Sequence, residues 1–320
     1  MKERLVVFSG AGFSKALGLP LTSELWELGL VCTEEALKYG FEPDEIKKCA
    51  PFKESVRRGD KDVETLLNDW ERHIEKNELH EETDSALASG RSYRDQYVTN
   101  LAMHLENLTL KGKAHPMAIQ FARWIKSTVD RYDLSFITTN YDRCVEYILN
   151  STGLTFAYMG KDAHVSIRKL HGSVNWMKFN GQVVREDRWK PVKIGELDGT
   201  GIFDFQLHDP AWFAAQLPPA IIPPTLNKRY EGVFQSQFED AGKLIRNADR
   251  VMFVGYSFPP ADKKLGEFLQ GAIADSSCKN FFCVNDNPDA QKRAAEITTN
   301  RQLTQICQRW TTDHFLRFSS

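Results

Sequence analysis

Five short segments of this sequence combine glycine with amide, hydroxyl, carboxylate or imidazole side chains, and each follows an apolar stretch. They are residues 10–14, 138–142, 171–173, 255–258 and 285–287. A glycine-rich turn at the start of a helix can hold phosphates with its backbone amides. A histidine can exchange a proton near neutral pH. Together, these residue types could position a phosphorylated substrate and transfer a proton.

The first segment, Gly10-Ala11-Gly12-Phe13-Ser14, follows the apolar residues 4–8. As a phosphate cradle it would offer its backbone amides and the Ser14 hydroxyl. Lys15 stands where the G-x-G-x-x-G pattern has its third glycine, so dehydrogenase-type binding is not supported. The same glycines would also suit a closely packed turn that binds nothing.

The other segments are equally ambiguous when taken singly. Asn140 could cap the following helix, because asparagine fills that position well. His171 could be a structural histidine, and Ser257 could be an ordinary turn residue. Only the occurrence of all the segments in one chain favours a functional site.

The elements that must position these segments alternate between strands and helices. Strands are predicted at 4–8, 133–139, 165–170, 250–254 and 280–284, and helices at about 115–127, 233–247 and 261–273. This alternation predicts a Rossmann-like, doubly wound α/β fold with a mostly parallel sheet. Ligands of such sheets bind beyond the carboxyl ends of the strands, where the segments would gather.

The pattern divides the chain into two parts. Residues 1–29 and 130–320 are predicted to form the Rossmann-like domain, and residues 30–129 a helical insertion. Residues 174–230 are predicted to be a proline-containing excursion from that domain. A type I′ hairpin is expected at Asn180-Gly181, because Asn-Gly stands there between β-rich flanks.

Composition narrows the class of partner. The 320 residues include 41 basic and 43 acidic side chains, a net charge of −2, so no general basic field would attract nucleic acid or an anionic membrane. No segment approaches the roughly 18 apolar residues of a membrane span. The six cysteines form no C-x-x-C pair, so we expect no zinc ribbon, no metal and no disulfide framework. These features favour a cytoplasmic protein.

Considered in order, the segments resemble the successive motifs of the Sir2 (sirtuin) superfamily. The resemblance is carried by residues 10–14, Gly18-Leu19-Pro20, residues 138–142, Leu170-His171-Gly172, Val254-Gly255-Tyr256-Ser257 and Val284-Asn285. Residues 139–142, 170–173, 222–225 and 255–258 are most similar to bacterial Sir2-like domains of antiphage defence systems.

The resemblance implies a role for each position. The residues that would bind NAD are Gly10, Ala11, Gly12, Ser14, Thr139, Gly255, Ser257 and Asn285. Among these, the first four would hold the phosphates, and Asn285 the adenosine ribose.

The same resemblance implies three catalytic residues. Asn140 would hydrogen-bond the nicotinamide ribose or a water beside it. Asp142 would recognise the nicotinamide carboxamide. His171 would be the general base, acting on a ribose hydroxyl or on the attacking water.

Two departures from the protein-deacylating sirtuins favour water as the acceptor. Those enzymes carry four zinc-binding cysteines, and this chain has no such set. Their Asp-Phe-Arg after Gly-Ile-Pro is here Leu21-Thr22-Ser23, and their usual glutamine before the catalytic asparagine is Thr139. We therefore expect an NAD glycohydrolase that releases nicotinamide and ADP-ribose, or a cyclised form of it. A sirtuin-type deacylase and a non-catalytic NAD or ADP-ribose sensor remain the alternatives.

The resemblance also implies how such an enzyme is used. Sir2-like defence proteins deplete NAD in an infected bacterium. They assemble as homo-oligomers or with a companion such as a HerA-like ATPase or an Argonaute-like protein. We expect an assembly of this kind here, with no direct contact to nucleic acid or membrane.

Overall fold

The computed structural model describes residues 2–21, 24, 25, 68, 98, 101–102, 104–112, 115–159, 163–178, 185–187, 190–192, 202–204, 219–222, 228, 230, 232–260, 262–298 and 301–319. Most of the predicted insertion and the predicted Asn180-Gly181 hairpin lie outside these residues. Within them, no helix has the length and apolarity to cross a bilayer.

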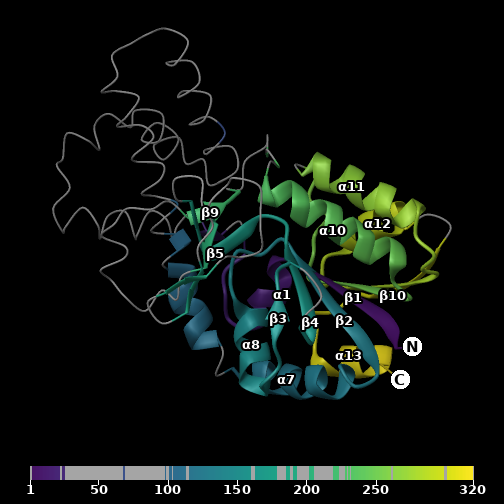
Figure 1. Cartoon of the computed structure of the whole chain (residues 1–320). Coiled ribbons are helices and arrows are strands. Elements are labelled where there is room, and N and C mark those ends of the chain that lie inside the picture. The colour runs from purple at the N-terminus through teal and green to yellow at the C-terminus, as the bar shows by residue number, and fades with distance from the viewer. Residues whose placement is uncertain are drawn as a thin grey trace, which may run out of the picture.

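A seven-stranded parallel sheet forms the centre of the molecule (Figure 1). In spatial order its strands are β12 (Gln302–Ile306), β11 (Asn280–Val284), β10 (Arg250–Val254), β1 (Glu3–Ser9), β2 (Tyr132–Thr138), β4 (Val165–Lys169) and β3 (Phe156–Ala157). The prediction of a mostly parallel, doubly wound sheet is confirmed.

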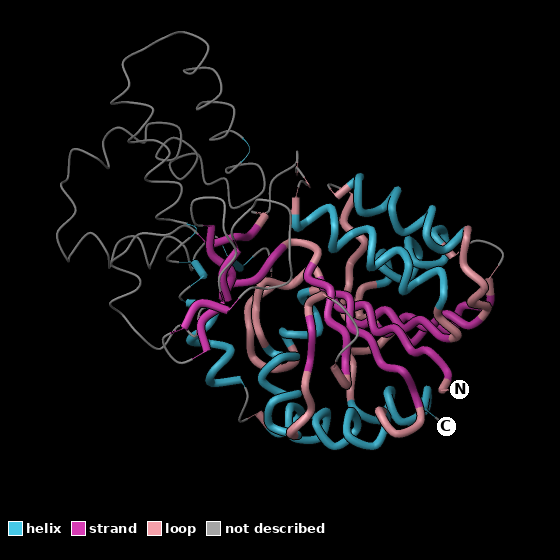
Figure 2. Tube along the Cα trace, in the orientation of Figure 1, coloured by secondary structure: helices cyan, strands magenta, loops and turns pink. Residues whose placement is uncertain are grey.

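Helices cover both faces of this sheet, as Figures 1 and 2 show. One face carries α7 (Pro116–Thr128), α8 (Cys144–Thr152) and α13 (Thr312–Ser319), and the other α10 (Val233–Asn247), α11 (Lys263–Ala274) and α12 (Pro288–Ile297). The short helix α1 (Ala11–Lys15) follows β1 directly.

The apolar run of β1 explains why this strand lies in the middle. Leu5 and Val7 belong to the core cluster beneath α7 and α8, whereas Val6 and Phe8 belong to the cluster beneath α10 and α11. Successive side chains of a strand point to opposite faces, so a continuous apolar run suits a strand that is covered on both.

The strand register places the five polar segments along one edge of the sheet. Ser9 at the end of β1 pairs with Thr138 of β2 and with Val254 of β10. Val254 in turn pairs with Val284 of β11, and Thr138 with Lys169 of β4. The chain directions agree, so residues 10, 139, 170, 255 and 285 all leave the sheet at its carboxyl edge.

The order of strands reverses between β1 and β10. From β1 the chain moves outward through β2 to β4, then returns to the other side of β1 for β10, β11 and β12. Apart from the additional edge strand β3, this is the 3-2-1-4-5-6 order of dinucleotide-binding folds. The crevice at such a reversal is where their ligands bind.

Several elements were not predicted from the sequence, although residues 176–178 belong to the β-rich flank expected before Asn180-Gly181. Besides β3, β12 and α13, the described residues include two smaller antiparallel sheets. One has the order β8-β5-β9, from β8 (Ile202–Asp204), β5 (Gly172–Lys178) and β9 (Pro219–Ile221), and the other pairs β6 (Arg185–Asp187) with β7 (Lys190–Val192). Strand β5 begins directly after His171 and so fixes the position of that residue.

Candidate active site

A cavity of about 470 Å³ lies at the carboxyl edge of the sheet, over the reversal between β1 and β10. Its volume is within the ~300–1,000 Å³ range of ligand pockets. Every predicted site residue except Gly10 lines it. The apolar part of its wall includes Pro20, Leu21, Leu25 and Leu105. The sequence segments therefore meet at one place, as the strand register requires.

One network of hydrogen bonds joins four of the predicted residues, Gly10, Ser14, Asn140 and Asp142. The Ser14 hydroxyl donates to Asp142 Oδ2 at 2.7 Å and accepts from Asn140 Nδ2 at 2.9 Å. Asn140 Nδ2 also donates to the Gly10 carbonyl at 2.9 Å. A hydroxyl has a single proton, so Ser14 links Asn140 to Asp142 instead of offering that proton to a phosphate.

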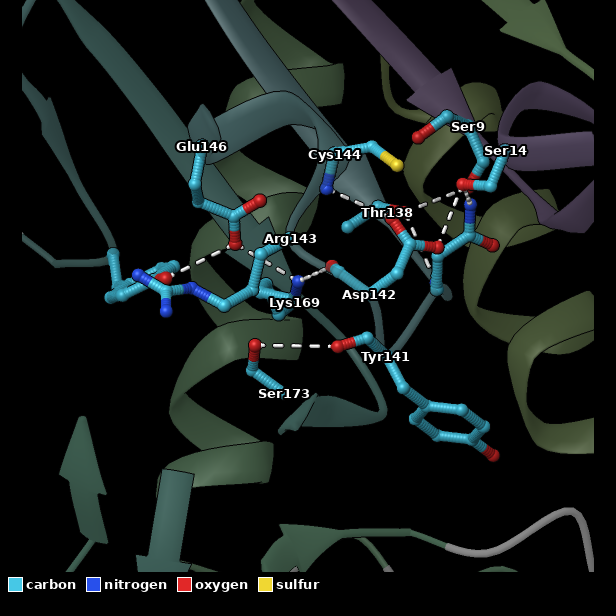
Figure 3. A network of polar contacts seen from close by, with 12 residues as sticks. Ser9, Ser14, Thr138, Tyr141, Asp142, Arg143, Cys144, Glu146, Lys169 and Ser173 are labelled. Atoms are coloured by element: carbon cyan, nitrogen blue, oxygen red, sulfur yellow. Dashed lines mark hydrogen bonds and ion pairs between the residues drawn. The ribbon is translucent and has the colours of Figure 1, made fainter. Parts of the chain in front are cut away.

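The loop that carries Asp142 is held from behind by a buried ammonium group (Figure 3). Lys169 Nζ donates to the Asp142 backbone carbonyl and pairs with Glu146 Oε1 at 2.9 Å. The Lys169 side chain is 0% exposed, so its charge is compensated within the protein by Glu146. Asp142 Oδ1 accepts the amide of Cys144, the first residue of α8, at 3.0 Å. The carboxylate is therefore fixed from both ends.

The glycines of the first segment bring two turns into close contact. The Gly12 amide donates to the Gly255 carbonyl at 2.9 Å. A Cβ atom on Gly12 would lie 2.8 Å from Gly255 Cα, and one on Gly255, whose φ is +60°, only 2.2 Å from the Phe13 nitrogen. Close packing thus requires these glycines, as the alternative interpretation of the segment supposed. The same turn also lines the cavity.

The turns at the other side of the cavity are held by the Asn285 side chain and by Arg293 of α12. Asn285 Nδ2 donates to the Tyr256 carbonyl at 2.8 Å, and Asn285 Oδ1 accepts the Asn287 amide at 3.0 Å. The Ser257 carbonyl accepts from Arg293 Nη2 at 2.9 Å. These bonds keep the loops after β10 and β11 in a fixed position at the cavity.

His171 lies at the cavity in a buried cluster of polar groups. Its Nε2 is 3.2 Å from Asp262 Oδ2 and 3.1 Å from the Tyr230 hydroxyl. Lys228 Nζ donates to the same Asp262 oxygen at 2.7 Å. Burial lowers the pKa of His171 and Lys228 lowers it further, while Asp262 opposes both. The net pKa lies below the usual 6.5, so the imidazole is neutral at pH 7 and can accept a proton.

Asp262, Lys228 and Tyr230 were missed by the sequence analysis. Asp262 directly precedes α11 and has the sequence position of a helix cap, although its side chain makes no cap hydrogen bond. Lys228 and Tyr230 follow a proline-containing stretch without periodicity. No spacing rule links residue 171 to residues 228 and 262, because only the tertiary fold brings them together.

No metal-ligand cluster of three or more His, Cys, Asp or Glu side chains occurs in the part of the chain that is described. Cys144, Cys278 and Cys283 are free and buried, and Cys307 is free and exposed. Activity without metal stays a prediction.

The fold and the cavity at its strand reversal define a Rossmann-like α/β protein with a ligand site at the carboxyl edge of the sheet. Residues 134–306, more than half of the chain, match the model of the SIR2-like domain. The chain therefore belongs to the SIR2-like family within the Sir2 superfamily.

Solved sirtuin structures are similar to the chain at low sequence identity. One, described as "The Structural basis of Sirtuin Substrate Affinity", is 14% identical, with 99% of this chain and 93% of that chain covered and a TM-score of 0.44. Another, a complex of a mutant Sir2 homologue with ADP ribose, is 15% identical, with 99% and 92% covered and a TM-score of 0.43. No curated protein sequence matches this chain.

Proposed function

We propose that this protein hydrolyses NAD at the bond between nicotinamide and ribose, giving nicotinamide and ADP-ribose. The observation that carries the proposal is the buried His171 imidazole at the same cavity as Asn140 and Asp142, where burial lowers its pKa. Membership of the SIR2-like family supports NAD as the substrate.

The chemistry needs what this cavity offers. When the C1′–N bond breaks, its electron pair leaves with nicotinamide and neutralises the pyridinium ring, while positive charge develops on the ribose. Water then adds to C1′ and loses one proton. His171 would take that proton and release it to solvent. Such a reaction needs rigid positioning and a base that is unprotonated at neutral pH, not a strong nucleophile.

One departure of the sequence supports water as the acceptor, because Leu21-Thr22-Ser23 replaces the Asp-Phe-Arg that sirtuins use beside the reacting ribose. Separately, Leu21, Leu25 and Leu105 line the cavity, so apolar side chains cover part of it. Excluding bulk water strengthens the interactions that stabilise a developing charge.

The deciding experiment is incubation of the purified protein with NAD alone, followed by chromatography. We expect nicotinamide and ADP-ribose in equal amounts. Turnover that requires an acylated peptide would instead show a deacylase, and binding without turnover would show a sensor.

Asn140→Ala and His171→Ala should each lower the rate of NAD hydrolysis by ~10²- to 10⁴-fold. Both variants also serve as controls against a contaminating hydrolase.

We further propose a biological role from the resemblance to antiphage Sir2-like domains. The hydrolysis would deplete NAD in a phage-infected bacterial cytoplasm. Expression of the wild-type protein, but not of His171→Ala, should lower the cellular NAD level when the trigger is present. An unchanged NAD level in infected cells that make active protein would contradict this role.

A further inference from the structure

His171 Nε2 faces two oxygen atoms. The other partners of each oxygen determine whether it donates or accepts a hydrogen bond. Asp262 Oδ2 lies 3.2 Å away, and the Tyr230 hydroxyl 3.1 Å away. The Tyr230 hydroxyl donates its proton to Asp262 Oδ1 at 3.1 Å. Toward the imidazole, Tyr230 can therefore only accept.

Asp262 can only accept as well, provided that it is ionised. Lys228 Nζ lies 2.7 Å from Asp262 Oδ2, and the two side chains are 6% and 3% exposed. Burial by itself would raise the pKa of Asp262, but His171 and Lys228 outweigh it and hold the pKa well below its usual value. At neutral pH the group is a carboxylate, which has no proton to donate.

From these contacts we infer that Asp262 is a positioning residue that holds His171 as the Nε2–H tautomer and leaves Nδ1 as the nitrogen that accepts the proton. The assignment of Nδ1 as the base rests on the proposed NAD hydrolysis, whereas the tautomer itself does not. The Asp262 and Tyr230 oxygens near Nε2 both act as acceptors, so Nε2 must carry the hydrogen. A neutral imidazole has one N–H, so Nδ1 keeps its lone pair.

The alternative role of Asp262, as a plain helix cap, is not supported by its geometry. The residue occupies the N-cap position of α11, but its side chain makes no cap hydrogen bond. Both of its oxygens are instead directed to Lys228, Tyr230 and His171. Carboxylates that orient a catalytic imidazole and fix its tautomer act in this way in other folds.

The charged and titratable groups that face His171 act in opposite directions on its pKa. Asp262 raises the pKa and Lys228 lowers it, while a hydrogen bond to the Thr139 backbone, which competes with Asp262 for the imidazole N–H, also raises it. The Tyr230 and Tyr141 rings lie at 6.0 and 6.2 Å from the imidazole, centroid to centroid. Removing Asp262 should therefore lower the pKa of His171, and removing Lys228 should raise it.

The tautomer can be measured without any substrate. The full chain is labelled with ¹⁵N-histidine, and the His171 signals are identified by their loss in His171→Gln. Two-bond ¹H–¹⁵N correlations at pH 7.5 should show the Nε2–H pattern in the wild type. Tyr230→Phe should keep this pattern, because Asp262 still accepts. A wild-type Nδ1–H pattern would overturn the inference, whatever the protein does to NAD.

A second experiment compares the NAD hydrolysis of Asp262→Asn with that of Lys228→Met. An asparagine amide can donate to Nε2, so Asp262→Asn no longer imposes the tautomer. For Asp262→Asn we expect kcat to fall by ~10²-fold or more with KM nearly unchanged. In a plot of kcat against pH, the fall in activity on the acidic side should move to lower pH in Asp262→Asn. In Lys228→Met it should move to higher pH. A folded Asp262→Asn enzyme with wild-type kcat and an unchanged pH profile would overturn the positioning role.

If the wild type does not cleave NAD but shows the Nε2–H pattern, the proposed function fails and the tautomer assignment stands.

Discussion

Polar side chains around the cavity mostly satisfy one another's hydrogen bonds. Ser14 bonds with Asn140 and Asp142, and Asn285 bonds with two backbone groups of neighbouring turns. A site held in this way needs little rearrangement when charge develops in the transition state. Several residues therefore act by positioning other side chains. Variants should distinguish this positioning role from direct contact with the substrate.

Ser14→Ala distinguishes these two roles. If Ser14 binds a phosphate, its loss should raise KM for NAD. Because its hydroxyl links Asn140 to Asp142, we expect a fall in kcat instead, of ~10-fold or more, with a smaller change in KM. Steady-state kinetics of NAD hydrolysis provide the measurement. Ser277→Ala, an exposed serine that bonds only to the Arg246 carbonyl, is the matched control and should change neither constant. A rise in KM alone would restore the phosphate role.

The lowered pKa of His171 should also appear in the stability of the protein. An unfolded histidine takes up its proton near pH 6.5, whereas folded His171, whose pKa is lowered chiefly by burial, does so only at lower pH. Between these two values the unfolded state binds more protons, so the free energy of unfolding falls as the pH drops below about 6.5. Urea unfolding at pH 7.5 and 5.5 measures the loss.

His171→Gln should lose less stability between those two pH values than the wild type does. The matched control is His164→Gln, which changes an exposed histidine and should keep the wild-type difference. An equal loss in His171→Gln and the wild type would contradict a lowered pKa for His171.

At the scale of elements, the turns after β1 and β10 lock into each other. Gly10 donates its amide to the Val254 carbonyl at 3.1 Å, and Gly12 donates to Gly255 at 2.9 Å. Trp310 supports the first turn from the other side, because its indole donates to the Phe13 carbonyl at 3.0 Å and stacks on the Phe13 ring. The two turns at the edge of the cavity are thus held by backbone hydrogen bonds to each other and by the Trp310 side chain behind Phe13.

Two glycine substitutions test this contact. Gly255 and Gly153 both have a positive φ, +60° and +75°, but only Gly255 has neighbours that a Cβ atom would strike. Gly153→Ala should cost ~1–2 kcal/mol of unfolding free energy, for the left-handed backbone alone. Gly255→Ala should cost clearly more, because the Phe13 backbone must move. Chemical denaturation measures both, and equal losses would show that the two turns do not interlock.

The buried pair of β4 and α8 provides a second test at this scale. Lys169→Met leaves the Glu146 carboxylate, 2% exposed, without its cation, and should cost ~3–5 kcal/mol. Adding Glu146→Gln removes the unpaired charge and should recover part of the loss. Urea unfolding of the two single variants and the double variant forms the cycle. Lys263→Met, at an exposed pair with Glu267, is the control and should change little.

For the whole molecule, the sequence predicted the elements with strong periodicity and missed those without it. The apolar runs of β1, β10 and β11 identify strands that are buried on both faces. By contrast β12 is an edge strand of mostly exposed residues, so its pattern carries no such signal. The packing of Trp310 against Phe13 and the Asp262–His171 contact join residues far apart in sequence. Local patterns do not encode such contacts.

The structure changes where control of the enzyme should be sought. An NAD hydrolase that is always active would deplete its own host, so the activity needs restraint. The helical insertion, residues 30–129, lies outside the predicted Rossmann-like domain and is the region where we expect this restraint. The segment after residue 310 is not available for it, because Trp310 and Phe315 are buried in the core beneath α7.

The described part of the insertion contacts the loop that carries Asp142 directly. Residues 104–112 are helical, and Leu105 lines the cavity. Glu106 pairs with Arg143 at 3.3 Å, with side-chain exposures of 2% and 6%, and Arg143 follows Asp142 in the chain. A shift of this helix would therefore be transmitted to the residue next to Asp142. Assembly through residues 30–129 could control the activity by this contact.

We accordingly predict that the protein acts as an assembly, either with itself or with a partner such as a HerA-like ATPase or an Argonaute-like protein. Light scattering should show a species larger than the 36.6 kDa chain, and the specific NAD hydrolysis rate should change with protein concentration or with the partner. His171→Ala should assemble like the wild type but lack activity, which separates assembly from catalysis. A strict monomer with full activity at every dilution, unaffected by proteins encoded by neighbouring genes, would contradict control by assembly. Restraint would then have to lie within the single chain, and the Glu106–Arg143 contact is where it would act.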